Sequence, residues 1–317
     1  MKSVRCNRYA MATFWEIQLW GDDPQYLESA GNEALREITR IEDQLSFYRE
    51  HSEVSDLNRR ASYEPVPVDP RLFRLLERAR ECSDAMEGAF DPTVAPLLRC
   101  WGFVNNTGKV PDDAEITFAL SKVGMSHILL DAAAMTVQFD REGVLIDFGA
   151  IGKGYAVECA AEILRDLAVA SALIHGGTSS VFAIGSPPDQ PAWRIALQNP
   201  VGEGKDDFLG YVNLMDQALS VSAPHGKWFE VDGKRYGHVI DPRSGRPTSW
   251  SLLAAVVTDS GTDSDALSTG LLTLGADGLE RLKAFRPKAS GLILSEGDGE
   301  GPPLLESNGS AFEFVSN

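Results

Sequence analysis

Cysteine is scarce in this sequence: Cys6, Cys82, Cys100 and Cys159 are the complete set among 317 residues. They form no Cys-x-x-Cys pair, and no cluster of histidine and cysteine has the spacing of a zinc site. We therefore expect neither a disulfide framework nor a structural zinc ion. Cys82 and Cys159 fall within helical patterns, where a buried thiol is the simplest interpretation.

Long apolar runs are also missing. No stretch approaches the roughly 20 apolar residues that a membrane-spanning helix needs. The N-terminal segment MKSVRCNRYAMATFWEIQLW lacks the apolar core and the small-residue cleavage site of a secretory signal. The sequence therefore predicts a cytoplasmic protein without a membrane-spanning segment.

Positive charge is in short supply, because 29 lysines and arginines face 46 acidic residues and leave a net charge of −17. Such a surface repels nucleic acids and anionic membranes, so we expect neither as a partner. An anionic ligand would need a metal ion or local dipoles to offset the background charge.

A regular strand–helix–strand alternation, internal repeats and low-complexity linkers are absent too. Strand patterns include residues 13–20, 127–131 and 135–139, and helical spacing is found at 27–45, 69–88, 112–123, 152–168, 262–274 and 277–285. The apolar segment GAFDPTVAPLLRCWGF contains Pro92 and Pro96, which predict an irregular buried stretch. This mixture favours an α+β fold, with residues 1–317 in one compact unit of two lobes.

A glycine-rich turn opens the helix expected at 152–168, in the stretch IDFGAIGKGYAVECAAEIL. Glycines in such a turn allow close backbone approach, and free N–H groups at a helix start attract anions. Asp147 and Lys153 lie on either side of the turn, and Lys153 could donate to a phosphate. Glycine-rich turns before helices are common, so a purely structural role stays open.

The stretch TDSGTDSDALSTGLLTLG predicts a helix with Thr262 or Asp263 as its N-cap. Asp265 and Thr269 are four residues apart and share one helix face, at the edge of an apolar stripe. A carboxylate and a hydroxyl so placed could hold magnesium, which prefers few protein oxygens together with phosphate and water. A capping cluster is the structural alternative.

Two further residues carry possible chemistry. His238, in YGHVIDPRSGRP, could be a general base because its pKa lies near neutrality, or it could be a structural histidine. Asp91, in GAFDPTV, could cap a turn or accept hydrogen bonds from a ligand.

Taken in order, these segments resemble the ApbE family of FAD:protein FMN transferases over about residues 8–285. The motifs that carry the resemblance are LSFYREHSEVSDLN, GAFDPTVAPLLRCWGF, IDFGAIGKGYAVE, HVIDPRSGRP and DALST. The resemblance implies a T-fold-like arrangement of mixed sheets with packed helices. It also implies magnesium-dependent transfer of FMN from FAD to a threonine hydroxyl of an acceptor flavoprotein, with release of AMP.

Matched position by position, the resemblance implies a role for each site residue. Asp265, Thr269 and the carbonyl of Ala150 would bind the metal, and His238 would take the proton from the acceptor threonine. FAD would contact a set drawn from several segments: Met11, Tyr48, Ala89, Phe90, Asp91, Asp147, Lys153 and Ile240.

The sequence departs from the family around residues 219–227, which read LSVSAPHGK, and it lacks the export or lipid-anchor signal that most members carry. Two alternatives to FMN transfer stay open. One is an FAD pyrophosphatase that releases FMN and AMP, and the other is a flavin-binding protein without turnover.

Overall fold

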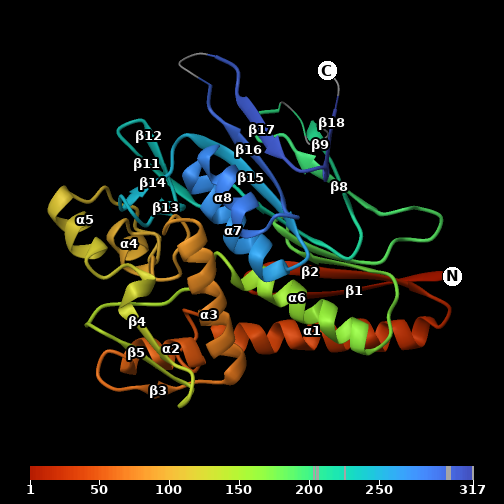
Figure 1. The fold of residues 1–317 in the computed structure, drawn as a ribbon, viewed down its shortest axis with the longest axis horizontal. Helices are drawn as coiled ribbons and strands as arrows, with labels where there is room; N and C mark the ends of the chain where they lie inside the picture. The colour runs from red at the N-terminus through yellow and green to blue at the C-terminus, as the bar shows by residue number, and fades with distance from the viewer. Residues whose placement is uncertain (203, 205–206, 225, 298–300, 316–317) are drawn as a thin grey trace.

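A long antiparallel sheet forms the centre of the computed structural model, which describes residues 1–202, 204, 207–224, 226–297 and 301–315. Within these residues the largest sheet has eight strands in the order β1-β2-β6-β7-β10-β15-β16-β17 (Figure 1). Their bounds are Lys2–Ala10, Thr13–Gly21, Ala172–Gly176, Ser180–Ile184, Ala218–Ser222, Ser251–Thr258, Ser290–Ser295 and Leu304–Asn308. Each neighbouring pair is antiparallel.

Helices cover one face of this sheet, and a small second sheet covers part of the other. Alternation along β2 points Trp15, Ile17 and Leu19 toward the helices. The helices on that face are α1 (Pro24–Leu45), α6 (Gly152–Asp166), α7 (Gly261–Leu274) and α8 (Asp277–Phe285). The opposite face packs Leu173 and Val181 against the sheet β18-β9-β8, whose strands are Phe312–Phe314, Phe208–Leu214 and Trp193–Gln198.

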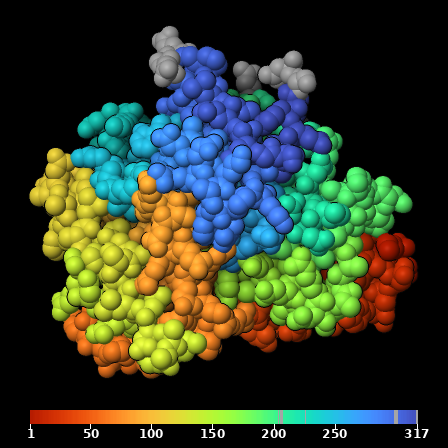
Figure 2. Space-filling model, viewed as in Figure 1, coloured from red at the N-terminus to blue at the C-terminus, as the bar shows by residue number. Residues whose placement is uncertain are grey.

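A second lobe lies to the left in Figure 1. It contains α2 (Glu53–Arg60), β3 (Val66–Pro67), α3 (Pro70–Ala85), α4 (Ala95–Cys100), α5 (Asp113–Leu120), η1 (Met125–His127), β4 (Ile128–Asp131) and β5 (Thr136–Phe139). The hairpins β11–β12 (Trp228–Val231, Lys234–Gly237) and β13–β14 (Ile240–Asp241, Arg246–Pro247) adjoin it. Figure 2 shows the orange α3 packed directly against the blue α7 and α8, so this helix joins the two lobes.

The α+β fold class predicted from the sequence is confirmed, and the helical patterns correspond to α1, α3, α5, α6, α7 and α8. The expectation of an irregular stretch around Pro96 is wrong in part. Helix α4 forms there because Pro96 occupies its first turn, where the missing N–H would have no helical partner. Strand β1 gave no clear pattern because, as an edge strand, it buries only Cys6 and Ala10 fully.

All four cysteines are free thiols, and Cys82 and Cys159 are buried as expected. Across the described residues, none of the helices has both the length and the apolar character needed to cross a bilayer.

Candidate functional site

Helices α6 and α7 cross so closely that their backbones touch. A Cβ on Gly154 would lie 2.1 Å from the carbonyl oxygen of Gly261, and a Cβ on Gly261 would lie 2.5 Å from that of Gly154. The Gly154 N–H donates to Oδ2 of Asp265 at 2.8 Å. The glycine-rich turn and the helix of Asp265 and Thr269, which are more than a hundred residues apart in sequence, therefore meet at one point.

We predict that Gly154→Ala destabilises the protein by about 2–3 kcal/mol, because overpacking at this crossing must push the helices apart. The free energy of unfolding from urea titration measures the effect. Gly152→Ala is the matched control in the same helix, since its Cβ would make only ordinary contacts, the nearest with Met11 at 3.4 Å. Equal stability of the two variants would contradict the prediction.

The N-cap of helix α7 lies two or three residues earlier than its sequence predicted. Its N-cap is Ser260, whose Oγ accepts from the Asp263 N–H at 3.2 Å, so the expected cap at Thr262 or Asp263 is wrong. Glu158 of α6 takes the Thr262 N–H at 2.8 Å instead. The helix is also buried on all sides, so Asp265, only 3% exposed, lies inside the protein rather than at the edge of an apolar stripe.

Oxygen atoms gather where α7 faces the end of β10. Oδ1 of Asp265 accepts no hydrogen bond from the part of the chain that the structure describes, while Oδ2 is used by Gly154. One turn further, Oγ1 of Thr269 lies 3.2 Å from Oγ of Ser222, which also contacts Ser268 at 2.8 Å. Asp265 and Thr269, four residues apart in α7, share one helix face, which follows from their spacing.

This oxygen set fits a divalent cation that shares its coordination with phosphate. Across residues 1–202, 204, 207–224, 226–297 and 301–315, no group of three or more histidine, cysteine or acidic side chains could enclose a metal. One buried carboxylate oxygen and one hydroxyl instead suit magnesium, which keeps waters and takes phosphate oxygens as further ligands. Ala150 lies in the turn that Gly154 brings to Asp265.

Asp147 is held in place by neighbours on both sides of the turn. Its N–H donates to the Pro92 carbonyl at 2.7 Å. The side chain of Asn58 forms two hydrogen bonds with the backbone of Ile146, the residue before Asp147. It donates to the Ile146 carbonyl at 2.9 Å and accepts from the Ile146 N–H at 2.8 Å. Burial raises the pKa of Asp147, while the Gly149 N–H and the charge of Lys227 oppose the rise.

The first helical turn of α6 is held by its own backbone: the Gly152 N–H donates to the Phe148 carbonyl at 2.7 Å, and the Gly154 N–H donates to Asp265. Its N-cap, Ile151, makes no side-chain capping bond, unlike Ser260 in α7. Met11 lies over this turn, in a β1–β2 connection where it and Ala12 both have positive φ. Partial burial raises the pKa of Tyr48, and the negative charge of Asp147 raises it further.

Asp91 closes a local turn. Its Oδ1 accepts from the N–H and hydroxyl of Thr93 at 2.8 and 2.6 Å, and its Oδ2 accepts from the Met125 N–H at 3.0 Å. The structure thus has the carboxylate in the capping role. Ala89 and Phe90 are 1% exposed, so both residues are almost wholly enclosed by the protein.

His238 lies between β12 and β13, under the loop that follows β10. Its Nδ1 is 3.1 Å from the carbonyl oxygen of Lys227. Burial lowers the pKa of His238, and the charges of Lys227 and Lys153 lower it further, against hydrogen bonds to the backbone at 227 and 224. The imidazole is therefore neutral at pH 7. Ile240, two residues on, is buried beside Trp101.

The comparisons with known proteins identify the family of the chain. The model of the ApbE family matches residues 11–293. The chain belongs to the ApbE family. It is 27% identical to the FAD:protein FMN transferase of Salmonella typhimurium over 91% of this chain and 83% of the relative. A Klebsiella pneumoniae protein of the same name is 32% identical over 79% and 77%.

Solved ApbE structures share the fold. The ApbE protein of Thermotoga maritima superposes with a TM-score of 0.85 at 30% identity, covering 96% of both chains. The flavin transferase ApbE of Vibrio cholerae gives a TM-score of 0.85 at 26% identity, covering 99% of both. The family expectation based on the ordered motifs is thus confirmed.

Two residues near the ApbE-type site, Ser222 and Lys227, were missed by sequence reasoning. Ser222 touches Thr269, and Lys227 contacts His238 and acts on the pKa of Asp147. Both fall within the stretch 219–227 that departs from the family pattern, and that departure was the available signal. His225 of the same stretch lies outside the described residues.

Proposed function

We propose that this protein transfers FMN from FAD to a threonine hydroxyl of an acceptor flavoprotein, with magnesium and with release of AMP. The observation that carries the proposal is the contact between the start of α6 and Asp265, which the hydrogen bond from the Gly154 N–H to Asp265 holds together. The names of the curated relatives, FAD:protein FMN transferase, support the same reaction class.

Charge neutralisation is the main task at this site, because phosphoryl transfer depends on positioning and electrostatics more than on covalent chemistry. Asp265, Thr269 and the Ala150 carbonyl would hold magnesium, which when bound supplies positive charge beside the diphosphate of FAD. Lys153 and the positive end of the α6 dipole add to that potential. Both contributions offset a protein charge of −17.

The remaining residues would bind the rest of FAD and activate the acceptor. Met11 and Tyr48 border the turn of Asp147, and the backbone of 89–91 adjoins it through Pro92. His238 is neutral at pH 7, so it could accept the proton of a threonine hydroxyl, which is a poor nucleophile without a base. Ile240 would support this side of the flavin site.

The decisive test is mass spectrometry of a threonine-bearing acceptor peptide after incubation with FAD and magnesium. We expect a covalent FMN adduct and one AMP per adduct, and the same peptide with valine in place of threonine is the control. AMP without an adduct would instead identify an FAD pyrophosphatase. Tight FAD binding without AMP would identify a flavin-binding protein.

A further inference from the structure

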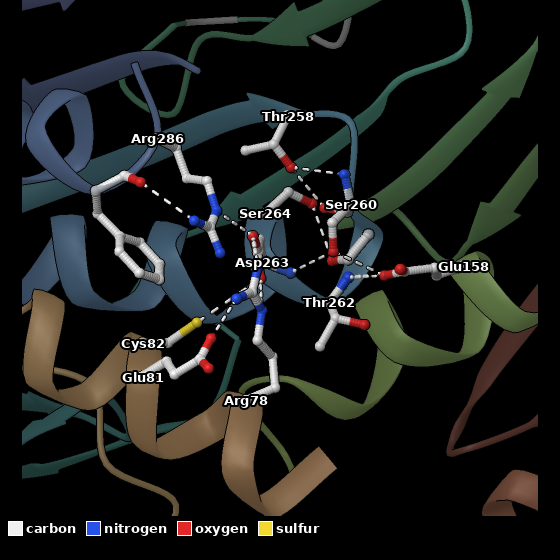
Figure 3. Close-up of polar contacts among 12 residues, drawn as sticks. Arg78, Glu81, Cys82, Glu158, Thr258, Ser260, Thr262, Asp263, Ser264 and Arg286 are labelled. Carbon is white, nitrogen blue, oxygen red and sulfur yellow. Dashed lines mark hydrogen bonds and ion pairs between the residues drawn. The ribbon is translucent and has the colours of Figure 1, made fainter. Parts of the chain in front are cut away.

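A buried carboxylate with two arginine partners lies on the side of α7 away from α6 (Figure 3). Asp263 has an exposed fraction of 0%. Arg78 of α3 donates to Oδ1 through Nε at 2.5 Å and also pairs with Oδ2. Arg286, just after α8, donates to Oδ2 through Nε at 2.7 Å. We call Arg78, Asp263 and Arg286 the α7 anchor.

The α7 anchor and the oxygen set of Asp265 act on opposite sides of the same helical turn. Residues two apart on an α-helix point about 200° from each other, since each residue turns the helix by about 100°. Asp263 accordingly faces α3 and the end of α8, while Asp265 faces Gly154 of α6. Rotation of α7 that moved one carboxylate would move the other.

The hydrogen bonds that Asp263 accepts from the two arginines are not needed to cap helix α7. Ser260 and Glu158 already receive the N–H groups of Asp263 and Thr262. The Asp263 side chain is thus left to tie α7 to two other elements through a bidentate pair and a second arginine. Bidentate arginine–carboxylate pairs fix orientation as well as distance.

We propose that Asp263 is a positioning residue: the α7 anchor sets the rotation of the first turn of α7 and so holds Oδ1 of Asp265 toward the metal. This inference rests on the proposed function, because the metal is part of it. A buried ion cluster can often be replaced by apolar residues without loss of stability, so orientation is the property that its replacement would expose.

The experiment compares two variants with wild type. Asp263→Asn removes the central charge, and the triple variant Arg78→Met, Asp263→Leu, Arg286→Met replaces the whole cluster with apolar side chains. Glu37→Gln is the matched control, since Glu37 of α1 is 4% exposed and pairs with Arg71 of α3 at 2.6 Å and with Arg40 of α1 at 3.1 Å. It removes a similar buried charge that has no partner on α7.

Two quantities are measured. One is amide hydrogen exchange over residues 262–270 in metal-free protein, and the other is the Kd for Mn²⁺, followed by electron paramagnetic resonance in the presence of FAD without acceptor. We expect both anchor variants to exchange amide hydrogens faster in the first turn of α7 and to bind Mn²⁺ about 10- to 100-fold more weakly. Losses of this size are typical when a residue that orients a metal ligand is replaced. Glu37→Gln should change neither.

An unchanged Mn²⁺ Kd in a folded triple variant would overturn the positioning role. If wild type itself bound no Mn²⁺, the magnesium part of the proposed function would fail instead. Amide exchange would then decide the inference: faster exchange in the triple variant supports an orienting anchor, and wild-type exchange rejects it.

Discussion

Replacing Asp265 by asparagine or alanine is expected to lower magnesium-dependent AMP release by at least about 1000-fold. A bound metal contributes several kcal/mol of charge stabilisation, and each 1.4 kcal/mol corresponds to about tenfold in rate. Asparagine keeps an oxygen that can accept the Gly154 N–H, so this variant separates metal binding from folding. AMP is measured by chromatography after incubation with FAD over a range of magnesium concentrations.

The control for this prediction is Asp259→Ala. Asp259 is exposed, lies just before the N-cap of α7, and has the same charge. It should keep wild-type release of AMP. Circular dichroism and thermal unfolding confirm that the Asp265 variants fold. Wild-type magnesium dependence in folded Asp265→Asn would remove Asp265 from the metal site.

Replacing His238 by alanine is expected to slow FMN transfer by about 100- to 10,000-fold, the usual range for a general base. The FAD Kd should change by much less, because the side chain acts on the acceptor hydroxyl. Initial rates of peptide flavinylation and fluorescence titration of FAD measure the two effects. His175→Ala is the matched control, since burial also lowers the pKa of that histidine.

The pH profile makes the His238 prediction sharper. Its pKa is lowered from the ordinary value of 6.5, so the neutral, proton-accepting form persists below that pH. Transfer by wild type should therefore fall in acidic solution with a midpoint below pH 6.5, as the imidazole protonates. The acidic limb should vanish in His238→Ala. A loss of FAD binding as large as the loss of rate would make His238 a cofactor contact instead.

Local sequence patterns were informative for helices and strands that bury one face, because their apolar residues then repeat with the period of the helix or strand. Apolar residues at helical spacing predicted α1 and α3. The same patterns were weaker at elements with little one-sided burial. β1 is a sheet edge, and α7 is buried all round, so its polar residues carried no sign of an inner or outer face.

The candidate site shows the same limit. The spacing of Asp265 and Thr269 predicted that they share a helix face, but Ser222 reaches Thr269 from a strand more than forty residues earlier. Asp91 could cap a turn or bind a ligand on sequence grounds, and only the contacts with Thr93 and Met125 show its carboxylate in the capping role. Contacts between residues far apart in the chain produce no repeating pattern in the sequence, so they could not be predicted from it.

By itself the sequence determined the fold class, the order of the family motifs and the pairs that one helical turn brings together, because these depend on neighbours within a few residues. The tertiary structure decided which atoms remain available for chemistry. Gly154 takes one oxygen of Asp265 and leaves the other, two arginines pair with both oxygens of Asp263, and burial depresses the pKa of His238. Hydrogen bonds and charges act between residues that are close in space. The crossing of helices and the closure of loops therefore decide which side-chain atoms are already bonded and which remain free.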